Sequence, residues 1–405
     1  MSEPGAGPLA GLLVADFSRV VAGPYAAMLL GDLGADVVKV ERPGAGDDTR
    51  GFGPPFVNPD PEAGEPLSAY FLSVNRNKRG VAWDLATDEG RRKALALAAR
   101  ADVLIENFKP GGATRFGLGY EDIAKINPGV VYCSVSGFGS SGEGAPLPGY
   151  DFLVQAVGGI MSITGDGEPR KVGVAVVDVL TALFASNAIL AALVERSSSG
   201  RGQRIEVDLL SSSLAALINQ ASTYLTTGAV PTAMGNRHPS IAPYEMLAAA
   251  DREMVVAVGN DSQFAALAGV VGKGWMGEDA RFSRNAARVG NRDEMVRELE
   301  EALSARPAAE WVGMFQAAGI PSGVVNDISE AFGLAEQVGL TPAVRVTHAS
   351  STAWTASEPD PAAQIADPMR LSRTPVSYRL PPPRLGEHSA EVESELGLDR
   401  DRGSP

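Results

Sequence analysis

The chain of 405 residues contains one cysteine, Cys133, and three histidines, His238, His348 and His388. One cysteine cannot form a disulfide within the chain, and these two residue types together are too few for a Cys- or His-rich metal site. A Ser-His-Asp hydrolase is disfavoured as well, because no Gly-x-Ser-x-Gly segment is present. We therefore expect a protein of the reducing cytoplasm, with no metal centre.

Basic stretches and targeting segments are also scarce. The formal net charge is -14 and no long basic run is present, which argues against a nucleic-acid partner. The N-terminus, MSEPGAGPLAG, lacks the basic and apolar regions of a signal peptide. A hydrophobic fraction of 44% and a charged fraction of 21% are typical of a soluble globular protein, and this length predicts two or three domains.

One long apolar run is present, over residues 172–194, and Asp178 is its only charged residue. The run is long enough to cross a bilayer. However, Thr181, Ser186 and Asn187 interrupt it, and no second run accompanies it. We therefore predict a buried core helix and no membrane partner.

Asp178 needs an explanation, because a buried carboxylate is costly unless it is paired, neutralised or catalytic. The ordinary explanations are a helix N-cap and a buried ion pair. Two features favour a catalytic role: a Gly- and Val-rich segment places Asp178 near a helix start, and the chain offers no other obvious nucleophile. A carboxylate can attack a carbonyl and form covalent acyl intermediates.

Strand and helix signals alternate over the first 140 residues. Thr87 should cap a helix that has Asp88 and Glu89 in its first turn. Apolar strands that alternate with helices indicate parallel βαβ units, so the predicted fold class is α/β with a Rossmann-like, parallel-sheet large domain. The expected strands are 12–17, 36–41, 81–85, 102–107 and 130–135, and the first helix is 25–33.

The remainder predicts a smaller α+β domain. Residues 150–225 are largely helical apart from a strand at 204–209, and a turn-rich loop covers 226–242. Strands near 253–258 and 323–326 and helices near 293–303 and 308–318 should follow. The predicted large domain is 1–205 with 340–405, the small domain is 225–330, and the linkers are 206–224 and 331–339.

A glycine-rich segment follows one of the strands. Gly137, Gly139 and Gly142 form Gly-x-Gly-x-x-Gly, but Pro146 and Pro148 exclude the helix that a dinucleotide fingerprint needs. We interpret this segment as a glycine loop.

Anion binding at a helix start is better supported. The helix after the first strand begins near Val21-Ala22-Gly23-Pro24, and its free N–H groups could hold a phosphate. Arg42 ends the second strand, and residues 75–79 are the densest basic cluster. The alternatives are an ordinary capped helix and a solvated charge cluster.

Nearly the whole chain resembles the class III coenzyme A transferases, the formyl-CoA transferase and CaiB/BaiF group. The resemblance rests on motifs that are weak singly but highly specific as an ordered set. They are Asp16-Phe17, Ala22-Gly23-Pro24, GADVVKVERP at 34–43, Asn77-Lys78-Arg79, Glu106-Asn107-Phe108, Gly149-Tyr150-Asp151, Asp178, GRGQ at 200–203 and LGEH at 385–388.

The resemblance makes Asp178 the nucleophile. It implies attack on an acyl-CoA thioester to give a mixed anhydride and CoA thiolate, and return of the thiolate to form an aspartyl-CoA thioester. An acceptor acid then takes up CoA through a second anhydride. A poorly hydrated pocket suits this chemistry, because it protects anhydrides from hydrolysis. Coenzyme A is then a substrate, and no permanently bound cofactor is expected.

The family's CoA-contacting positions carry over by motif. Lys78 and Arg79 are weaker candidates, and Ser136 stands where some members have a lysine. Residues 235–239 replace the glycine-rich loop of formyl-CoA transferase, so Arg237 and His238 are candidates to line the acceptor pocket. The expected CoA contacts are Val21, Ala22, Arg42, Trp83, Asp84, Leu85, Asn107, Phe108 and Arg115.

A racemase of the same fold would pair Asp178 with a histidine directly before Asp151. Tyr150 occupies that position. Its reference pKa of about 10 suits proton shuttling near neutrality poorly, so CoA transfer is favoured. A racemase-like enzyme and a CoA-binding protein without turnover are the alternatives.

The substrates are predicted from resemblance alone. Segments 149–164 and 236–244 look most like the branch that acts on dicarboxylates, such as succinyl-CoA with glutarate. Tyr150 and His238 could contact substrate, and Arg237 could bind a distal carboxylate or be an exposed loop arginine. Family members form interlocked homodimers, so the same is expected here. The sequence does not fix the donor, the acceptor or the pathway.

Overall fold

The computed structural model describes residues 7–58, 66–348, 351–353 and 360–398, which divide into two compact units. The first comprises Met1–Ile160, Val172–Thr226 and Ala335–Pro405, and the second comprises Met161–Lys171 and Thr227–Leu334. Residues 206–224, predicted as a linker, form the end of a strand and two helices of the first unit. Residues 161–171, predicted for the large domain, belong to the second unit.

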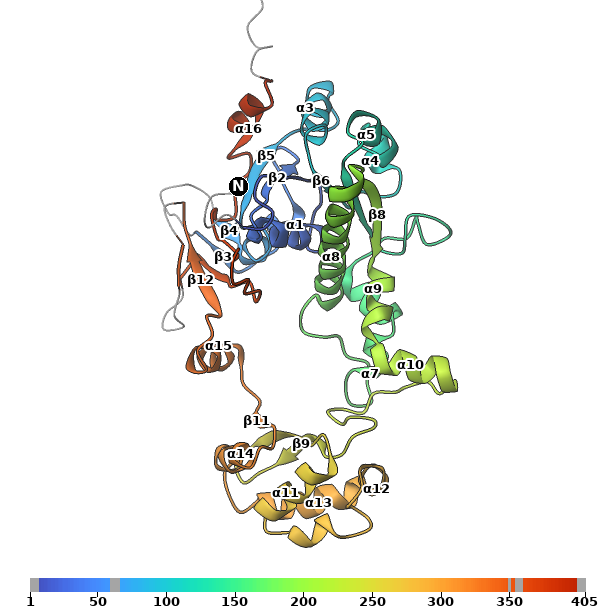
Figure 1. The fold of residues 1–405 in the computed structure, drawn as a ribbon, viewed down its shortest axis with the longest axis vertical. Helices are drawn as coiled ribbons and strands as arrows, with labels where there is room; N and C mark the ends of the chain where they lie inside the picture. Colours follow the sequence, from blue (N-terminus) through green and yellow to red (C-terminus); the bar gives the residue numbers. More distant parts are fainter. Residues whose placement is uncertain (1–6, 59–65, 349–350, 354–359, 399–405) are drawn as a thin grey trace, which may run out of the picture. The chain divides into compact units, whose positions relative to one another are not determined.

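A six-stranded parallel sheet is the centre of the first unit (Figure 1), and it confirms the α/β class. The strand order β5-β2-β1-β6-β7-β8 is that of a doubly wound dinucleotide-binding fold. The order reverses between β1 and β6, so a crevice opens at the carboxyl ends of these strands. The strands are β1 (Leu13–Asp16), β2 (Asp36–Glu41), β5 (Lys78–Ala82), β6 (Val103–Glu106), β7 (Val131–Ser136) and β8 (Gln203–Asp208).

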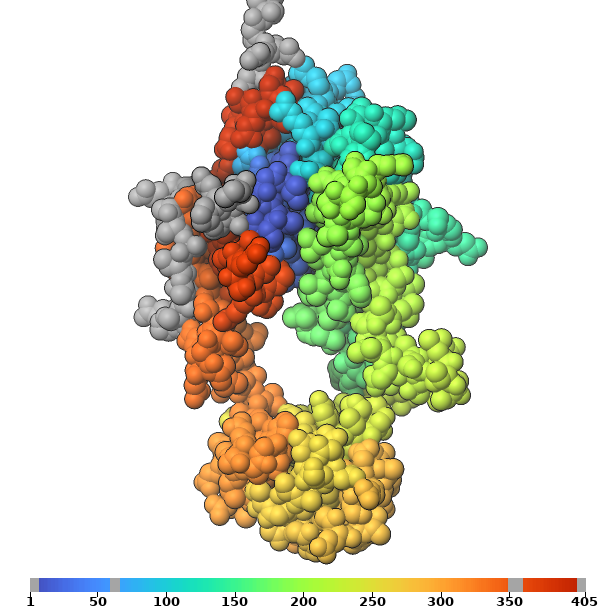
Figure 2. Space-filling model, viewed as in Figure 1, coloured from blue at the N-terminus to red at the C-terminus, as the bar shows by residue number. Residues whose placement is uncertain are grey.

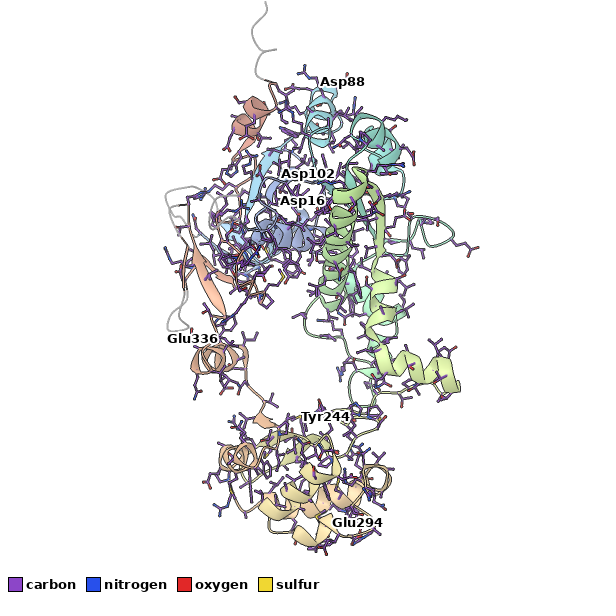
Figure 3. The ribbon with its side chains drawn as sticks, viewed as in Figure 1. Asp16, Asp88, Asp102, Tyr244, Glu294 and Glu336 are labelled. Atoms are coloured by element: carbon purple, nitrogen blue, oxygen red, sulfur yellow. The ribbon has the colours of Figure 1, made fainter. Side chains whose placement is uncertain are left out.

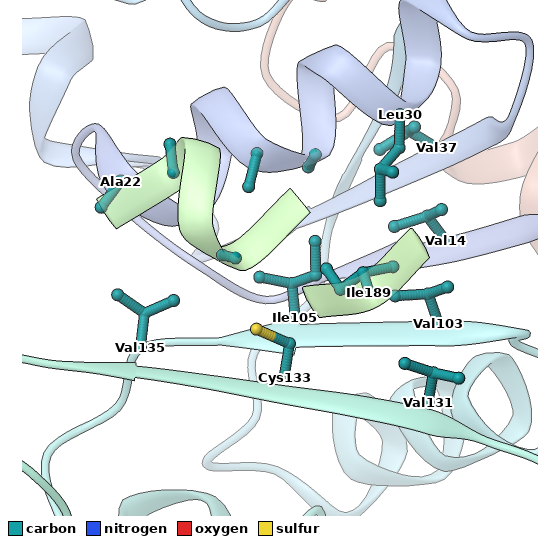
Figure 4. Close-up of a cluster of buried hydrophobic side chains, with 14 of the residues drawn as sticks. Val14, Ala22, Leu30, Val37, Val103, Ile105, Val131, Cys133, Val135 and Ile189 are labelled. Carbon is teal, nitrogen blue, oxygen red and sulfur yellow. The ribbon is translucent and has the colours of Figure 1, made fainter. Parts of the chain in front are cut away.

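Both faces of the inner strands of this sheet are buried, whereas the edge strand β8 is partly exposed. Successive side chains of a strand point to opposite faces, and accordingly Val14 and Ala15 of β1 belong to two different hydrophobic clusters. Figure 4 shows the cluster of Val14, in which Leu30 and Ile189 from two helices lie with Ile105 of β6. Burial on both faces explains why these strands are continuous apolar runs.

Helices cover the sheet on both sides. Thr87 caps α3 by accepting a hydrogen bond from the Gly90 N–H, as predicted, and Asp88 lies at the outer start of that helix (Figure 3). The helices of the first unit are α1 (Ala22–Asp32), η1 (Asp48–Gly51), α2 (Ala69–Leu72), α3 (Asp88–Ala98), α4 (Gly112–Arg115), α5 (Tyr120–Ile126), α6 (Asp151–Val157), α8 (Val176–Ser199), α9 (Leu209–Ala216) and α16 (Ser389–Glu395). Three further helices, α7 (Ile160–Ile163), α10 (Ile218–Thr227) and α15 (Ile328–Gln337), have residues in both units.

Two small sheets complete the first unit. β3 (Phe56–Val57) pairs with β4 (Leu67–Ser68), and β12 (Ala343–Val346) lies between β13 (Ser351–Ala353) and β14 (Ala363–Ile365). All of these pairings are antiparallel.

The second unit is a small α+β assembly. Its antiparallel sheet has the order β11-β10-β9, and Phe264, Leu299 and Phe315 from its helices are fully buried in one core. The strands are β9 (Tyr244–Ala248), β10 (Glu253–Ala257) and β11 (Ser322–Val324). The helices are α11 (Asp261–Val270), η3 (Gly274–Gly277), α12 (Asn285–Gly290), α13 (Arg292–Leu303) and α14 (Ala308–Ala317).

Two elements, β5 and α1, begin three residues earlier than predicted. β5 begins at Lys78, three residues before the predicted strand, because acidic partners allow the charged side chains at its start to lie inside the fold. α1 begins at Ala22 rather than residue 25, because a proline such as Pro24 is well tolerated in the first helical turn.

The apolar run 172–194 forms most of α8, which is buried on one face only. Val177, Ala185 and Ile189 are fully buried, so the predicted core helix is confirmed for this face. The opposite face is exposed, with Phe184 44% and Val194 71% accessible, and α8 lies at the visible surface of its unit in green (Figure 2). By length and composition alone, α8 could cross a membrane, although a helix packed in a soluble core meets the same criterion.

Candidate active site

A cavity of about 640 Å³ lies at the carboxyl ends of β1, β6 and β7, where the strand order reverses. It is therefore at the position where open α/β sheets bind ligands. Residues from five segments of the first unit line it: Arg19–Ala22, Asp48, Asn107–Pro110, Val135–Gly137 and Ala145–Tyr150, together with Asp178 and Leu209.

The loop between β1 and α1 forms one wall and is held by side chains from other segments. The Asn107 amide accepts a hydrogen bond from the Arg19 N–H and donates one to the Arg19 carbonyl, at 2.9 and 2.8 Å. Lys39 donates to the Ser18 carbonyl, and Asp47 accepts from the Val20 N–H. Val20 has a φ of 70°, which is strained for a β-branched residue. Contacts from other segments thus hold the loop in a backbone conformation that is unfavourable for Val20 itself.

The same wall ends in the N-terminus of α1. Val21, at the N-cap position, makes no side-chain cap, and the first turn contains no acidic residue. Its leading N–H groups are therefore suited to hold an anion. Gly23 is required here, because a Cβ atom would lie 2.3 Å from the Ser18 side chain.

Asp178 reaches the cavity from the first turn of α8. It is neither an N-cap nor an ion-pair partner, because Ala175 occupies the N-cap position and no cation among the described residues contacts its carboxylate. Asp178 is 9% exposed. Burial, and secondarily the charge of Asp151, raises the pKa of Asp178 to about 7. An unpaired, poorly hydrated carboxylate of this kind is basic and can serve as a nucleophile.

Asp151 on α6 supports the start of α8. Its Oδ1 accepts a hydrogen bond from the Val177 N–H at 2.8 Å and a longer one from the Asp178 N–H at 3.4 Å. Gln155, one turn later, donates to Asp151 Oδ2 at 2.7 Å and accepts from the Val172 N–H at 2.8 Å. The segment that leads into the first turn of α8 is thereby tied to α6.

The cavity brings together some of the predicted CoA contacts. Val21, Ala22, Asn107 and Phe108 line it together with Asp178. Five predicted contacts are not among the lining residues: Arg42, Trp83, Asp84, Leu85 and Arg115.

The predicted CoA contacts outside the cavity range from buried in the fold to exposed elsewhere on the first unit. Trp83 is buried and donates a hydrogen bond from Nε1 to Glu393, and Asp84 accepts one from the Ala86 N–H. Arg42 is exposed after β2, and Arg115 is exposed with its guanidinium 4.9 Å from the Phe116 ring centroid. Their contact with CoA therefore stays a prediction.

The basic cluster at residues 75–79 is neither a solvated cluster nor a part of the cavity. Lys78 is fully buried and donates hydrogen bonds to Asp16, Asn75 and the Pro24 carbonyl. Burial lowers the pKa of Lys78 to about 8, although the charge of Asp16 opposes the shift. Asp16 is itself fully buried within the sheet unit (Figure 3). Arg79 pairs with Asp36, so both basic side chains are committed to the fold.

The predicted acceptor residues belong to different units. Tyr150 lines the cavity and is 62% exposed. Arg237 lies in the second unit, where it pairs with Asp293 at 3.0 Å. The His238 ring lies 5.3 Å from the Tyr244 ring, at an angle of 58°, and its Nδ1 accepts a hydrogen bond from the Ser240 N–H. The roles of Arg237 and His238 thus stay predictions.

Three charged residues of the cavity wall, Arg19, Asp48 and Lys109, were not predicted from the sequence. Arg19 and Asp48 form an exposed ion pair at 3.2 Å, and both line the cavity. Asp48 follows the second strand closely, which was the one available signal. Ser136, at the position where some family members have a lysine, also lines the cavity.

The glycine loop after β7 contains no regular helix and no dinucleotide fingerprint. A Cβ atom on Gly137 would lie 2.5 Å from the Cα of Gly149, so the glycines allow two backbone segments to touch. Within the described ranges, no group of three or more His, Cys, Asp or Glu side chains could hold a metal ion.

Comparison with known proteins identifies this architecture. Residues 9–389 match the model of CoA-transferase family III. The succinate–glutarate CoA-transferase of Agrobacterium fabrum is 41% identical over 96% of this chain and 96% of its own length. The succinyl-CoA:glutarate CoA-transferase of Mus musculus is 41% identical over 98% of this chain and 88% of its own.

A solved structure agrees with the sequence relatives. A CaiB/BaiF family protein from Brucella suis superposes with a TM-score of 0.83 at 40% identity, covering 96% of this chain and 100% of its own. The chain therefore belongs to CoA-transferase family III. It is an enzyme of the transferase class, and CoA thioesters are its substrates.

Proposed function

We propose that this enzyme moves CoA from a dicarboxylic acyl-CoA, such as succinyl-CoA, to a second dicarboxylate through covalent intermediates on Asp178. The observation that carries the proposal is the placement of Asp178, a buried carboxylate without a cation partner among the described residues, in the cavity at the sheet's switch point. Two relatives of 41% identity that are succinate–glutarate or succinyl-CoA:glutarate CoA-transferases support the choice of substrates.

The reaction starts with the ionised Asp178. Its oxygen attacks the thioester carbonyl of the donor, the C–S bond breaks, and CoA leaves as the thiolate. The thiolate then attacks the aspartyl carbonyl of the mixed anhydride, which releases the donor acid and leaves an aspartyl-CoA thioester. The acceptor carboxylate attacks this thioester to give a second anhydride and free thiolate. Attack of the thiolate on the acceptor carbonyl forms the new acyl-CoA and restores Asp178.

The cavity supplies what these steps need. The leading N–H groups of α1 and the side chain of Arg19 can hold anionic parts of the substrate. The low exposure of Asp178 limits the access of water, which would otherwise divert anhydrides and thioesters to hydrolysis.

A transfer assay with matched variants tests the proposal. Succinyl-CoA is incubated with a panel of mono- and dicarboxylic acids, and the new acyl-CoA is measured by mass spectrometry. We expect dicarboxylates such as glutarate to be the preferred acceptors. Asp178→Ala should abolish transfer and leave CoA binding largely intact, whereas Glu143→Gln, which changes an exposed loop acid, should retain it. Full activity of Asp178→Ala would contradict the covalent mechanism.

A racemase-like reaction predicts a different product. Racemisation would introduce deuterium from heavy water at the α-carbon of a branched acyl-CoA without any exchange of the acid. We expect acid exchange without deuterium at that carbon. The reverse pattern would favour the racemase, and CoA binding with neither reaction would indicate a protein without turnover.

We also propose that the enzyme is a homodimer, on the basis of family resemblance and its exposed apolar helices. No residue of α10 is buried, and its apolar side chains Ile218 and Leu225 are 75% and 78% exposed. Val194 of α8 is 71% exposed. Large apolar side chains that are exposed on a single chain are typical of a protein–protein interface. Light scattering should give twice the 42.1 kDa mass of the chain, and a monomer would contradict the proposal.

A further inference from the structure

Asp151 places a second negative charge close to Asp178, the proposed nucleophile. Its Oδ1 is 3.4 Å from the backbone nitrogen of Asp178, and α6 and α8 pack against each other. At this short range the negative charge of Asp151 disfavours the ionisation of Asp178. The oxygen of a neutral asparagine could accept from the same α8 N–H groups without this cost.

The hydrogen bonds explain one part of this arrangement. α8 has no side-chain cap of its own, because Ala175 is at the N-cap position. Asp151, which belongs to α6, accepts hydrogen bonds from the Val177 and Asp178 N–H groups. It therefore caps the start of α8 in place of an N-cap side chain. A carboxylate is favourable at this helix end, because the helix dipole is positive there.

Gln155 makes the arrangement rigid. Its amide donates to Asp151 Oδ2 and to the Val174 carbonyl, and its oxygen accepts from the Val172 N–H. Gln155 is fully buried. The two α6 side chains therefore fix the backbone from residue 172 to 178, which sets where the Asp178 carboxylate enters the cavity.

Among the described residues, no positive charge offsets Asp151 at the nucleophile. Asp151 is the charged residue that acts on Asp178, and Tyr70 of α2 lies within electrostatic reach of both carboxylates. The other ionisable side chains that line the cavity are Arg19, Asp48, Lys109 and Tyr150. The charge of Asp151 therefore adds to burial in keeping Asp178 basic.

We propose that Asp151 is a positioning residue for CoA transfer: it holds the first turn of α8 in place and its negative charge keeps the Asp178 carboxylate reactive toward thioesters. A more basic carboxylate is a stronger nucleophile toward a carbonyl. This inference rests on the proposed covalent role of Asp178.

The test compares Asp151→Asn with Gln155→Met. The Asp151→Asn variant keeps a side-chain oxygen for the α8 N–H groups and removes the charge. Both variants lose the hydrogen bond between residues 151 and 155, but Gln155→Met retains the charge of Asp151. The rate of aspartyl-CoA formation from succinyl-CoA is measured from pH 5 to 9 for both variants and for the wild type.

We expect the acidic limb of this rate profile to move to lower pH by about one unit in Asp151→Asn, because a like charge next to Asp178 is removed. The rate on the alkaline plateau should fall several-fold, because the nucleophile is less basic. In Gln155→Met the limb should stay where it is in the wild type. A limb that does not move in Asp151→Asn, or that moves equally in both variants, would overturn the inference.

A second measurement separates this inference from the proposed function. The stabilisation produced by Asp178→Asn at pH 8 is measured in the wild-type and Asp151→Asn backgrounds by urea unfolding, which needs no turnover. We expect a smaller stabilisation in the Asp151→Asn background, and equal values would overturn the electrostatic role of Asp151. Failure of the wild type to form any aspartyl-CoA would instead contradict the proposed function, and the unfolding measurement would still decide the effect of Asp151 on Asp178.

Discussion

Replacing Asp178 with asparagine should make the protein more stable at alkaline pH while removing its activity. The side chain keeps its size, but the variant carries no charge in a site that is 9% exposed and has no cation partner among the described residues. The free energy spent on ionising a buried group in the wild type is then recovered in the variant.

The size of the effect follows from the pKa of Asp178, which burial raises to about 7 in the folded protein. An unfolded aspartate has a pKa of about 4, so between these values the folded state keeps a proton that the unfolded state has lost. The wild type therefore loses stability as the pH rises through this window. Linkage gives a penalty of about 4 kcal/mol at pH 8 and about 1.5 kcal/mol at pH 5.

Urea unfolding followed by circular dichroism measures this difference. Asp178→Asn should exceed the wild type in free energy of unfolding at pH 8 by several kcal/mol, and the excess should shrink by about 2.5 kcal/mol at pH 5. Glu143→Gln removes an exposed carboxylate of the same unit and should show neither effect. Equal stability of Asp178→Asn and wild type at pH 8, or an excess that does not change with pH, would refute the reasoning.

Three further substitutions test the walls and the support of the cavity. Gly23→Ala places a methyl group against Ser18, 2.3 Å away, and should weaken CoA binding about ten-fold in calorimetry; unchanged affinity would show that the loop adapts freely. Val20→Gly removes the strain of a φ of 70° and should raise the free energy of unfolding by about 1 kcal/mol, whereas a loss of stability would mean that the valine is not strained. Arg76→Met leaves Asp32 buried without its ion pair at 2.6 Å and should cost about 3 kcal/mol or more in urea unfolding; a neutral effect would contradict that pairing.

Much of the sheet could be predicted from sequence, because its strands are apolar runs bounded by turn residues. β2 has the predicted bounds, and Thr87 caps α3 as predicted. The sequence predicts a start for β5 that is three residues too late, because Lys78 and Arg79 are residue types that are usually solvated. Their acidic partners, Asp16 and Asp36, are distant in sequence, so burial of these charges depends on a tertiary arrangement that local patterns do not contain.

The candidate nucleophile could be predicted from the sequence, but the contacts that position it could not. Asp178 was identified because an acid in an apolar run is unusual, and its position in the first turn of α8 confirms the predicted helix start. The hydrogen bonds of Asp151 to the start of α8 could not be predicted, because they join it to Val177 and Asp178 across 26 and 27 residues. The clamp of Asn107 on Arg19, across 88 residues, was beyond local patterns for the same reason.

Trapping the covalent intermediate tests the central claim most directly. The enzyme is incubated with succinyl-CoA in the absence of an acceptor, treated with hydroxylamine, digested and analysed by peptide mass spectrometry. Hydroxylamine converts an aspartyl-CoA thioester to an aspartyl hydroxamate, and we predict this modification on the peptide that contains Asp178. Transfer activity with no modification of Asp178, or with modification of another carboxylate, would contradict the account.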